Sequence, residues 1–332
     1  MHNFHDYKLN IDQDLQFNFE IGVDYFADLL GFSPSKNFIK LLSSKNLKYR
    51  AITQSELNSH YLNFISYMFN DTIPSGPKRQ LDWETGWEQN YRELVDNQNT
   101  LDSLLPHYYR RGQNIMRFQG NFIIPEDPFF ERIFLDTLLS SIKEKFLAQK
   151  SHIYEFAAGS CYNIATLANQ TTDKHFFALD WAKSSQKIFE FLSKNKSSFG
   201  LKDNELTAKR FDFFYPDNDF KIEPGSLVYT FGGLEQLGTD FEALLNYFLA
   251  QESAEFLHFE PITEAYDRTT LFGEMGYQYA IKRNYLNGYS EKLQELEEKK
   301  IIEIITHKPV IGSAFHDGWT MIHFRVNQKS AI

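Results

Sequence analysis

The sequence predicts an α/β protein with a mostly parallel, doubly wound sheet, and two observations lead to this prediction. Residues 154–168 read as a strand, a turn of small residues and a helix, and residues 175–186 read as a second strand that ends in an aspartate. Further on, compact apolar runs at 226–233 and 254–261 flank a segment of helical periodicity at 238–251. Strands that alternate with helices in this way form parallel sheets.

The remaining strands extend this sheet and end it with an antiparallel pair. Residues 206–217 read as a third strand that ends in Asp212. Near the C-terminus, the apolar runs 301–309 and 319–327 are joined by a short loop that contains glycine. This loop is too short for a parallel crossover, so we expect the two runs to pair antiparallel.

Residues 1–114 are organised differently and predict a helical cap or lid region, whereas residues 115–332 form the α/β domain. The N-terminal helices are expected where apolar residues recur at i, i+3 and i+4, with a loop at 72–80. These segments are 23–32, 38–44, 57–69 and 84–105. Such a cap could cover a substrate pocket, or it could serve only for stability or for dimerisation.

The turn after the first strand suits the close approach of a ligand. Glu155 ends the strand, and the small residues Ala157 and Gly159 let a ligand come near the backbone. Asp180 follows about two dozen residues later, where a carboxylate can accept hydrogen bonds from both hydroxyls of a ribose. Tyr162 stands where a dinucleotide fingerprint has its third glycine, which argues against NAD. An ordinary buried turn between a strand and a helix is the alternative.

The spacing Glu155-x-Ala157-x-Gly159-x-Cys161 resembles the E/D-x-G-x-G-x-G loop of class I S-adenosylmethionine-dependent methyltransferases, with two of three glycines replaced. The resemblance covers residues 115–327 and implies their Rossmann-like fold, with S-adenosyl-L-methionine as the cofactor. It also implies that Asp180 anchors the ribose, that Asp212 accepts from the adenine amino group and that Phe213 lies against the adenine. The implied cofactor-binding set is Glu155, Ala157, Gly159, Cys161, Asp180, Trp181, Asp212, Phe213 and Phe231.

Several longer strings resemble one bacterial subgroup of these enzymes, which is found near genes for surface polysaccharides and other sugar modification. They are residues 117–131, 179–186, 231–238, 258–267, 282–289 and 315–320. The resemblance implies O-methylation of a small molecule, with a sugar or nucleotide sugar as the expected acceptor.

Candidate catalytic residues follow the fourth and fifth strands, where this fold brings the acceptor to the methyl group. His258 is the first candidate for a general base because imidazole titrates near neutral pH, and Glu260 and Glu235 are further candidates. A buried core histidine is the alternative for His258. We expect no metal, although His258, Glu260 and His316 are residue types that bind divalent ions.

The expected acceptor-binding residues include a cluster of arginines at 107–117. Guanidinium groups bind phosphate oxygens in pairs, so Arg110 and Arg117 could hold an anionic acceptor, or they could pair with the acidic surface of a linker. The full expected set is Arg110, Arg117, Gln236, Glu264 and His316.

Composition limits the partners. The 332 residues carry a formal net charge of −10, which argues against a nucleic-acid substrate. Cys161 is the only cysteine, which excludes an internal disulfide. The polar opening and the lack of a long apolar run predict a cytoplasmic protein without membrane insertion. A homodimer, a dinucleotide-dependent oxidoreductase and a catalytically silent partner subunit remain open.

Overall fold

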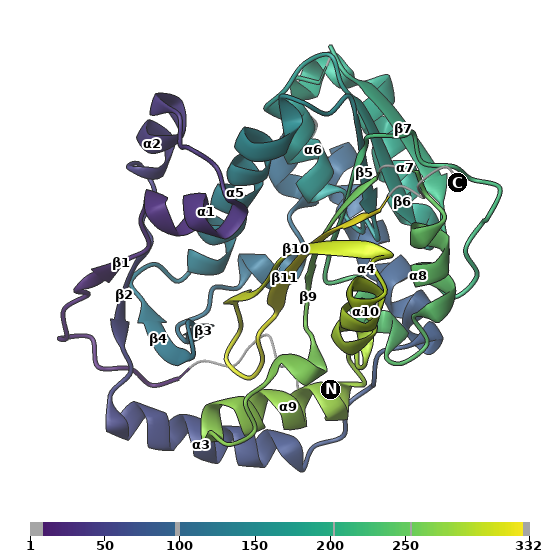
Figure 1. Cartoon of the computed structure of the whole chain (residues 1–332). Helices are drawn as coiled ribbons and strands as arrows, with labels where there is room; N and C mark the ends of the chain where they lie inside the picture. Colours follow the sequence, from purple (N-terminus) through teal and green to yellow (C-terminus); the bar gives the residue numbers. More distant parts are fainter. Residues whose placement is uncertain (1–8, 97–99, 202, 253, 328–332) are drawn as a thin grey trace.

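A seven-stranded sheet lies at the centre of the structure, a computed structural model that describes residues 9–96, 100–201, 203–252 and 254–327 (Figure 1). Its strands are β5 (His152–Phe156), β6 (His175–Asp180), β7 (Glu205–Arg210), β8 (Leu227–Phe231), β9 (Glu255–Glu260), β10 (Ile302–Ile311) and β11 (Trp319–Val326). They lie in the order β10-β11-β9-β8-β5-β6-β7. The strands from β9 to β7 pair parallel, and β11 pairs antiparallel with both of its neighbours.

This strand order confirms the predicted Rossmann-like fold of class I methyltransferases with its antiparallel C-terminal strand. The chain runs outward through β5, β6 and β7 and then returns to place β8 on the other side of β5. The point where the direction reverses therefore lies between β5 and β8. In open α/β sheets, ligands bind at such a point, beyond the carboxyl ends of the strands.

Helices cover both faces of this sheet because its strands are apolar on both sides. The helices are α5 (Phe130–Ile142), α6 (Tyr162–Asn169), α7 (Lys183–Lys194), α8 (Glu242–Leu249) and α10 (Tyr289–Glu298), whereas α9 (Leu271–Arg283) packs against α3 in a separate hydrophobic cluster. One hydrophobic cluster packs α5, α6 and α7 against Ile153 and Phe176, and a second packs α8 and α10 against Val228 and Phe256. Successive residues of a strand point to opposite faces, so each strand contributes to both clusters.

Two predicted boundaries differ from the structure. Strand β7 ends at Arg210 rather than at Asp212, because the Asp212 carboxylate accepts a hydrogen bond from the Phe214 amide at 3.0 Å and starts a turn. The helix expected from residue 238 begins only at Glu242, after Gly238 with a φ of 56°.

The N-terminal helices are close to their predicted positions. They are α1 (Val23–Leu30), α2 (Lys36–Leu42), α3 (Gln54–Met68) and α4 (Gln80–Asp96). Helix α3 begins with a capping box in which the Thr53 and Glu56 side chains each bind the backbone of the other residue. Helix α4 packs against α7 and ends at Asp96, so the expected helix to residue 105 is too long.

A second, four-stranded antiparallel sheet was not predicted. Its strands are β1 (Phe19–Glu20), β2 (Lys48–Ala51), β3 (Met116–Phe118) and β4 (Asn121–Pro125), in the order β1-β2-β4-β3. Gln119 and Gly120 have φ values of 47° and 76° and form the tight turn between β3 and β4. Strand β4 follows residue 115 but pairs with β2. The two predicted regions therefore share a sheet, and their division at residue 115 stays a prediction.

Arg117 connects segments that are far apart in the sequence. Its side chain is fully buried, and its guanidinium lies 3.5 Å from the centre of the Phe272 ring. It donates hydrogen bonds to Asp317 Oδ1 at 3.1 Å and to the Phe272 carbonyl at 2.9 Å. The structure corrects the expectation that Arg117 binds the acceptor, because its side chain is fully buried away from the pocket and pairs with Asp317, although its Nη1 has no partner.

We predict that Asp317→Asn lowers the free energy of unfolding by about 2 kcal/mol, because it leaves the buried Arg117 charge without its counterion. Urea denaturation measures the change. The control is Asp240→Asn at an exposed position, which should change stability by less than about 0.5 kcal/mol. Equal stability of the two variants would contradict the role of the Arg117 ion pair.

Candidate functional site

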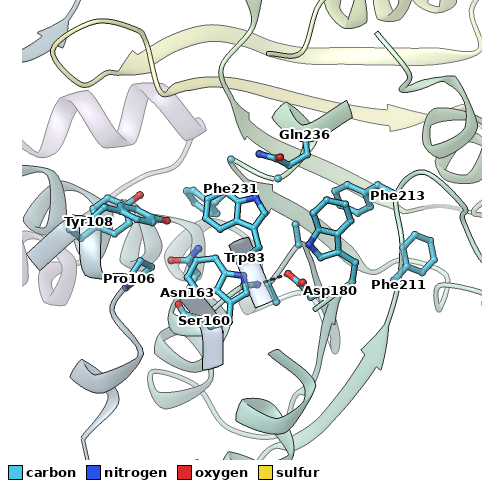
Figure 2. Close-up of a pocket in the computed structure, with 18 residues that line it drawn as sticks. Trp83, Pro106, Tyr108, Ser160, Asn163, Asp180, Phe211, Phe213, Phe231 and Gln236 are labelled. Atoms are coloured by element: carbon cyan, nitrogen blue, oxygen red, sulfur yellow. Dashed lines mark hydrogen bonds between the residues drawn. The ribbon is translucent and has the colours of Figure 1, made fainter. Parts of the chain in front are cut away.

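A pocket lies at the carboxyl ends of β5, β6 and β8, where the strand order reverses (Figure 2). It encloses about 800 Å³ of space, including the part open to solvent. Eight of its 18 lining residues are aromatic, which suits a planar ligand such as a nucleobase. The lining residues are Trp83, Trp87, Pro106, Tyr108, Tyr109, Ala157, Ala158, Gly159, Ser160, Asn163, Asp180, Trp181, Phe211, Phe213, Phe231, Gly232, Gly233 and Gln236.

In the loop between β5 and α6, the three positions that correspond to the glycines of the E/D-x-G-x-G-x-G pattern have the positive φ that glycine favours. Ala157, Gly159 and Cys161 have φ values of 57°, 54° and 61°, all in the left-handed region. Glycine adopts this region freely, whereas a residue with a side chain pays about 1–2 kcal/mol there. The loop therefore keeps its conformation at both positions where glycine is replaced.

Glu155 stabilises this loop through hydrogen bonds to the first turn of α6. Its carboxylate accepts hydrogen bonds from the Ile164 amide and the Asn163 side chain, each at 3.0 Å, and from the Tyr229 hydroxyl at 3.3 Å. Burial raises the pKa of Glu155 to about 8. Glu155 does not line the pocket, so the structure corrects its expected contact with the cofactor: it positions the loop and the start of α6.

Asp180 lines the pocket at the end of β6 and connects the loop to that strand. Its Oδ2 accepts from the Gly159 amide at 2.8 Å (Figure 2). Its Oδ1 accepts from the Ala182 amide at 2.7 Å. Burial raises the pKa of Asp180 to about 6, so the group is ionised at neutral pH. An ionised carboxylate accepts about four hydrogen bonds, so Asp180 has acceptor capacity left for a ligand beyond its bonds to these two amides.

Helix α4 forms the roof of the pocket. The rings of Trp83 and Trp87 stack with their centres 5.4 Å apart, and a Cβ added at Gly159 would lie 2.9 Å from Trp87 Cζ2. Glu84 fixes this helix to α7, because its carboxylate accepts from the Lys183 amide at 2.6 Å and the Ser184 amide at 3.1 Å. The N-terminal region thus contributes directly to the pocket.

The two tryptophans were missing from the predicted site, and so were Tyr108 and Tyr109. The available signal was the spacing of Trp83 and Trp87, since residues four apart share one face of a helix. That spacing alone does not show whether the two indole rings line a ligand pocket or pack into the hydrophobic core.

Six of the nine predicted cofactor-binding residues line the pocket, and Glu155, Cys161 and Asp212 do not. Ala157, Gly159, Asp180, Trp181, Phe213 and Phe231 all line it. The structure corrects the expectation for Cys161, whose buried thiol lies 3.5 Å from the Ser185 carbonyl beneath the loop. It also corrects the expectation for Asp212, whose carboxylate caps its own turn.

His258 lies in the core and not at the pocket, which corrects its assignment as general base. Its ring is fully buried between Phe248, Tyr289 and Phe324 and is paired with the Thr230 hydroxyl at 2.9 Å. Burial lowers the pKa of His258 to about 3. A histidine that stays neutral and out of reach of a ligand cannot take a proton from it.

Glu260 and Glu235 have different roles. Glu260 is fully buried, and its carboxylate accepts from the Gly233 amide at 3.1 Å and the Glu235 amide at 3.3 Å, so it positions the loop after β8. This corrects its expected catalytic role. Glu235 is partly exposed and accepts from the Gln236 side chain at 2.9 Å. Gln236 lines the pocket, and its role in binding the acceptor stays a prediction.

The other expected acceptor-binding residues do not line the pocket. Arg110 donates to the Ser103 and Leu105 carbonyls and to Glu93, which corrects its assignment. Glu264 accepts from the Ser290 amide at 2.7 Å and caps α10, which corrects its assignment too. His316 stacks on Tyr279 with ring centres 4.7 Å apart.

Two further findings concern metals and membranes. In the described ranges, no three His, Cys, Asp or Glu side chains are grouped in a way that could hold a metal ion. Across the same residues, the structure contains no helix whose length and hydropathy would let it cross a bilayer.

Comparisons with known proteins find neither a matching family model nor a matching curated protein. Among solved structures, the chain is similar to the N,N-8-amino-8-demethyl-D-riboflavin dimethyltransferase of Streptomyces davawensis, with 14% identity and a TM-score of 0.37 over 72% of this chain and 69% of that one. It is similar to an O-methyltransferase from neocarzinostatin biosynthesis (13% identity, TM-score 0.39, 73% and 69% covered). It is also similar to the mitomycin 7-O-methyltransferase, with 13% identity and a TM-score of 0.38 over 90% of this chain and 79% of that one. At such low TM-scores, the fold assignment rests on strand order.

We predict that Ala157→Gly raises the free energy of unfolding by about 0.5–1 kcal/mol, because glycine removes the strain of a left-handed alanine. Urea denaturation measures the change. The matched control is Ala158→Gly in the same loop, where φ is not positive, and it should lower stability by about 1 kcal/mol. If both variants lose stability equally, the loop does not carry this strain.

Proposed function

We propose that this protein is an S-adenosylmethionine-dependent methyltransferase that acts on a hydroxyl group of a small molecule. The observation that carries the proposal is the left-handed loop at 157–161 held against Asp180 at the reversal point of the sheet. S-adenosylmethionine would supply an electrophilic methyl group on a sulfonium. The protein's task is then to align the acceptor oxygen and to exclude water.

The residues around the pocket fit this cofactor. Asp180 has the acceptor capacity for ribose hydroxyls, and the loop at 157–159 exposes its backbone at the neighbouring position. Trp181, Phe211 and Phe213 supply aromatic surface for an adenine. Ser160 and Asn163 supply polar groups next to the loop for the amino-acid portion.

We also propose that residues 1–114 act as a lid over this pocket. Trp87 covers Gly159, so a cofactor that approaches the backbone there has to displace the indole ring. The contacts between helix α4 and α7 include polar ones, among them the Glu88–Lys187 ion pair at 2.9 Å, and the apolar packing of Tyr91 on Phe191. The polar contacts separate more easily than a packed apolar core.

Glu235 is the best candidate for the base that would activate a hydroxyl acceptor. Glu235 does not itself line the pocket, but it is next in the chain to Gln236, which does, and its carboxylate accepts from the Gln236 side chain. Burial raises the pKa of Glu235 to about 7, against the lowering effect of Arg283. A carboxylate that titrates near neutral pH can take a proton from a hydroxyl at the moment of transfer. The acceptor we propose is a sugar or a related hydroxyl compound, as the resemblance implies.

A catalytically silent relative is the second candidate, and the position of Trp87 favours it. An indole that stays against Gly159 would keep the cofactor away from the loop. The cytoplasmic location, the absence of a nucleic-acid partner and a homodimer remain proposals from the sequence.

Calorimetric titration with S-adenosylhomocysteine tests the cofactor, with NAD as the control ligand. We predict micromolar binding of S-adenosylhomocysteine alone, and at least ten-fold weaker binding by Asp180→Asn, because the amide offers fewer acceptor sites for the ribose. The matched control is Asp212→Asn in the turn after the next strand, which should bind as the wild type does. Failure of the wild type to bind would favour the silent relative.

The same titration should depend on pH through Asp180. Burial raises the pKa of this carboxyl to about 6, and only the ionised form accepts from both hydroxyls of a ribose. The affinity for S-adenosylhomocysteine should therefore fall about ten-fold between pH 7.5 and pH 5 as Asp180 gains its proton. The Asp180→Asn variant should lose this dependence, and a wild-type affinity that is constant over this range would exclude ionised Asp180 as the ribose acceptor.

A further inference from the structure

Three buried hydrogen-bond donors without a partner belong to residues at or next to the Gln236 end of the pocket. They are Arg79 Nη1, Arg283 Nε and Trp83 Nε1, which are among several such buried side-chain atoms in the described residues. Trp83 lines the pocket, and Arg79 and Arg283 both act electrostatically on Glu235, the neighbour of the lining residue Gln236. Buried polar groups are nearly always hydrogen-bonded, and an unpaired one costs about 1–3 kcal/mol. Three such donors near one pocket indicate an acceptor group that binds there.

Contacts on several elements bring these donors together. The Arg79 guanidinium lies 5.2 Å from the centre of the Trp83 ring, and Trp83 lines the pocket. The Ser75 amide donates to the Arg283 carbonyl at 2.7 Å, so the segment before α4 is fixed to the end of α9. The Gln236 side chain accepts from the Gly76 amide and donates to Ser75 Oγ, each at 3.4 Å.

The charge of this region is positive enough to attract an anion. Burial holds the pKa of Glu235 at about 7, although the positive charges of Arg283 and Arg79 both lower it, so Glu235 is only partly ionised at neutral pH. Arg79 also pairs with Asp82 at 2.9 Å, and Asp82 is 52% exposed, so solvent weakens this pair. Arg283 lies 5.6 Å from the centre of the Tyr285 ring.

We propose that Arg79 and Arg283, together with the indole N–H of Trp83, bind an acidic group of the acceptor. A carboxylate or a phosphate has the oxygens that guanidinium groups bind in pairs. The acceptor is then a hydroxyl compound with one acidic group, such as a sugar acid or a sugar phosphate. Its identity as the acceptor rests on the proposed function, whereas binding of the anion does not.

The anion site proposed here uses Arg79 and Arg283, whereas the sequence suggested Arg110 and Arg117. Arg110 donates to carbonyls and to a carboxylate of the protein itself, and Arg117 is fully buried away from the pocket, although its Nη1 also has no partner. Arg79 and Arg283 differ in their place: both act electrostatically on Glu235, whose neighbour Gln236 lines the pocket. The acidic group would lie next to Glu235, the proposed base. An anion bound by two guanidinium groups fixes the orientation of the acceptor hydroxyl relative to that base.

The test is a titration of the full chain with inorganic phosphate and, separately, with acetate, followed by indole fluorescence. Sodium chloride keeps the ionic strength constant. We expect a saturable change with at least one probe, and the stronger of the two distinguishes a phosphate acceptor from a carboxylate acceptor. Arg79→Gln and Arg283→Gln should each weaken this binding at least ten-fold.

The matched control is Arg92→Gln on α4, because Arg92 is 74% exposed, pairs with Glu88 and does not act on Glu235; it should bind the anion as the wild type does. Arg79→Lys keeps the positive charge but loses the paired donors of the planar guanidinium group, so this variant should bind the anion with intermediate affinity. If Arg79→Gln does not fold, Arg79→Lys tests the role of Arg79 in its place. No saturable change with either probe, or an equal loss in Arg92→Gln, would overturn the proposal.

S-adenosylhomocysteine titrations of the same samples separate the two proposals. Arg79→Gln and Arg283→Gln should bind it as the wild type does, because Asp180 and the loop at 157–161 are unchanged. If the wild type binds phosphate or acetate but not S-adenosylhomocysteine, the anion site stands and the proposed function fails. If it binds only S-adenosylhomocysteine, the proposed function stands and the anion site fails.

Discussion

The pocket depends on buried carboxylates at the ends of strands, each of which accepts hydrogen bonds from backbone amides of the pocket loops. Asp180 binds Gly159 and Ala182 at the end of β6, Glu155 binds Ile164 below β5, and Glu260 binds Gly233 and Glu235 beyond β9. Burial raises the pKa of all three carboxyls. An amide without such an acceptor would be unpaired inside the protein, so these bonds determine the loop shapes.

The sheet could be predicted from the sequence because its strands are buried on both faces. Such strands form continuous apolar runs, and the residues that end them interrupt the runs clearly. The small sheet gave no such signal. Strand β1 has two residues, and β2 pairs with β4 more than 70 positions later, which no local pattern indicates. The aromatic residues of this region are equally consistent with helices.

The candidate site could be predicted in position but only partly in role. The acidic residues Glu155, Asp180 and Glu260 all stand at strand ends, as expected, but only Asp180 faces the pocket. Alternation along a strand predicts which face a side chain takes, but it does not tell whether a terminal carboxylate turns to a ligand or to a nearby amide. His258 shows the same limit, because its alternation with Glu260 indicates a shared side and not its depth in the core.

The stacked tryptophans connect the two parts of the pocket. Trp87 covers Gly159, where the cofactor would meet the loop, and Trp83 lies beside Arg79 at the proposed anion site. A ligand that displaces Trp87 would also move Trp83, because the rings stack and sit one turn apart on the same helix. Under the proposed function, binding of the cofactor would thus change the position of the Trp83 indole N–H, which is one of the donors proposed to bind the acceptor. Affinities for the two ligands would then be coupled, and by thermodynamic linkage to the same extent in both directions.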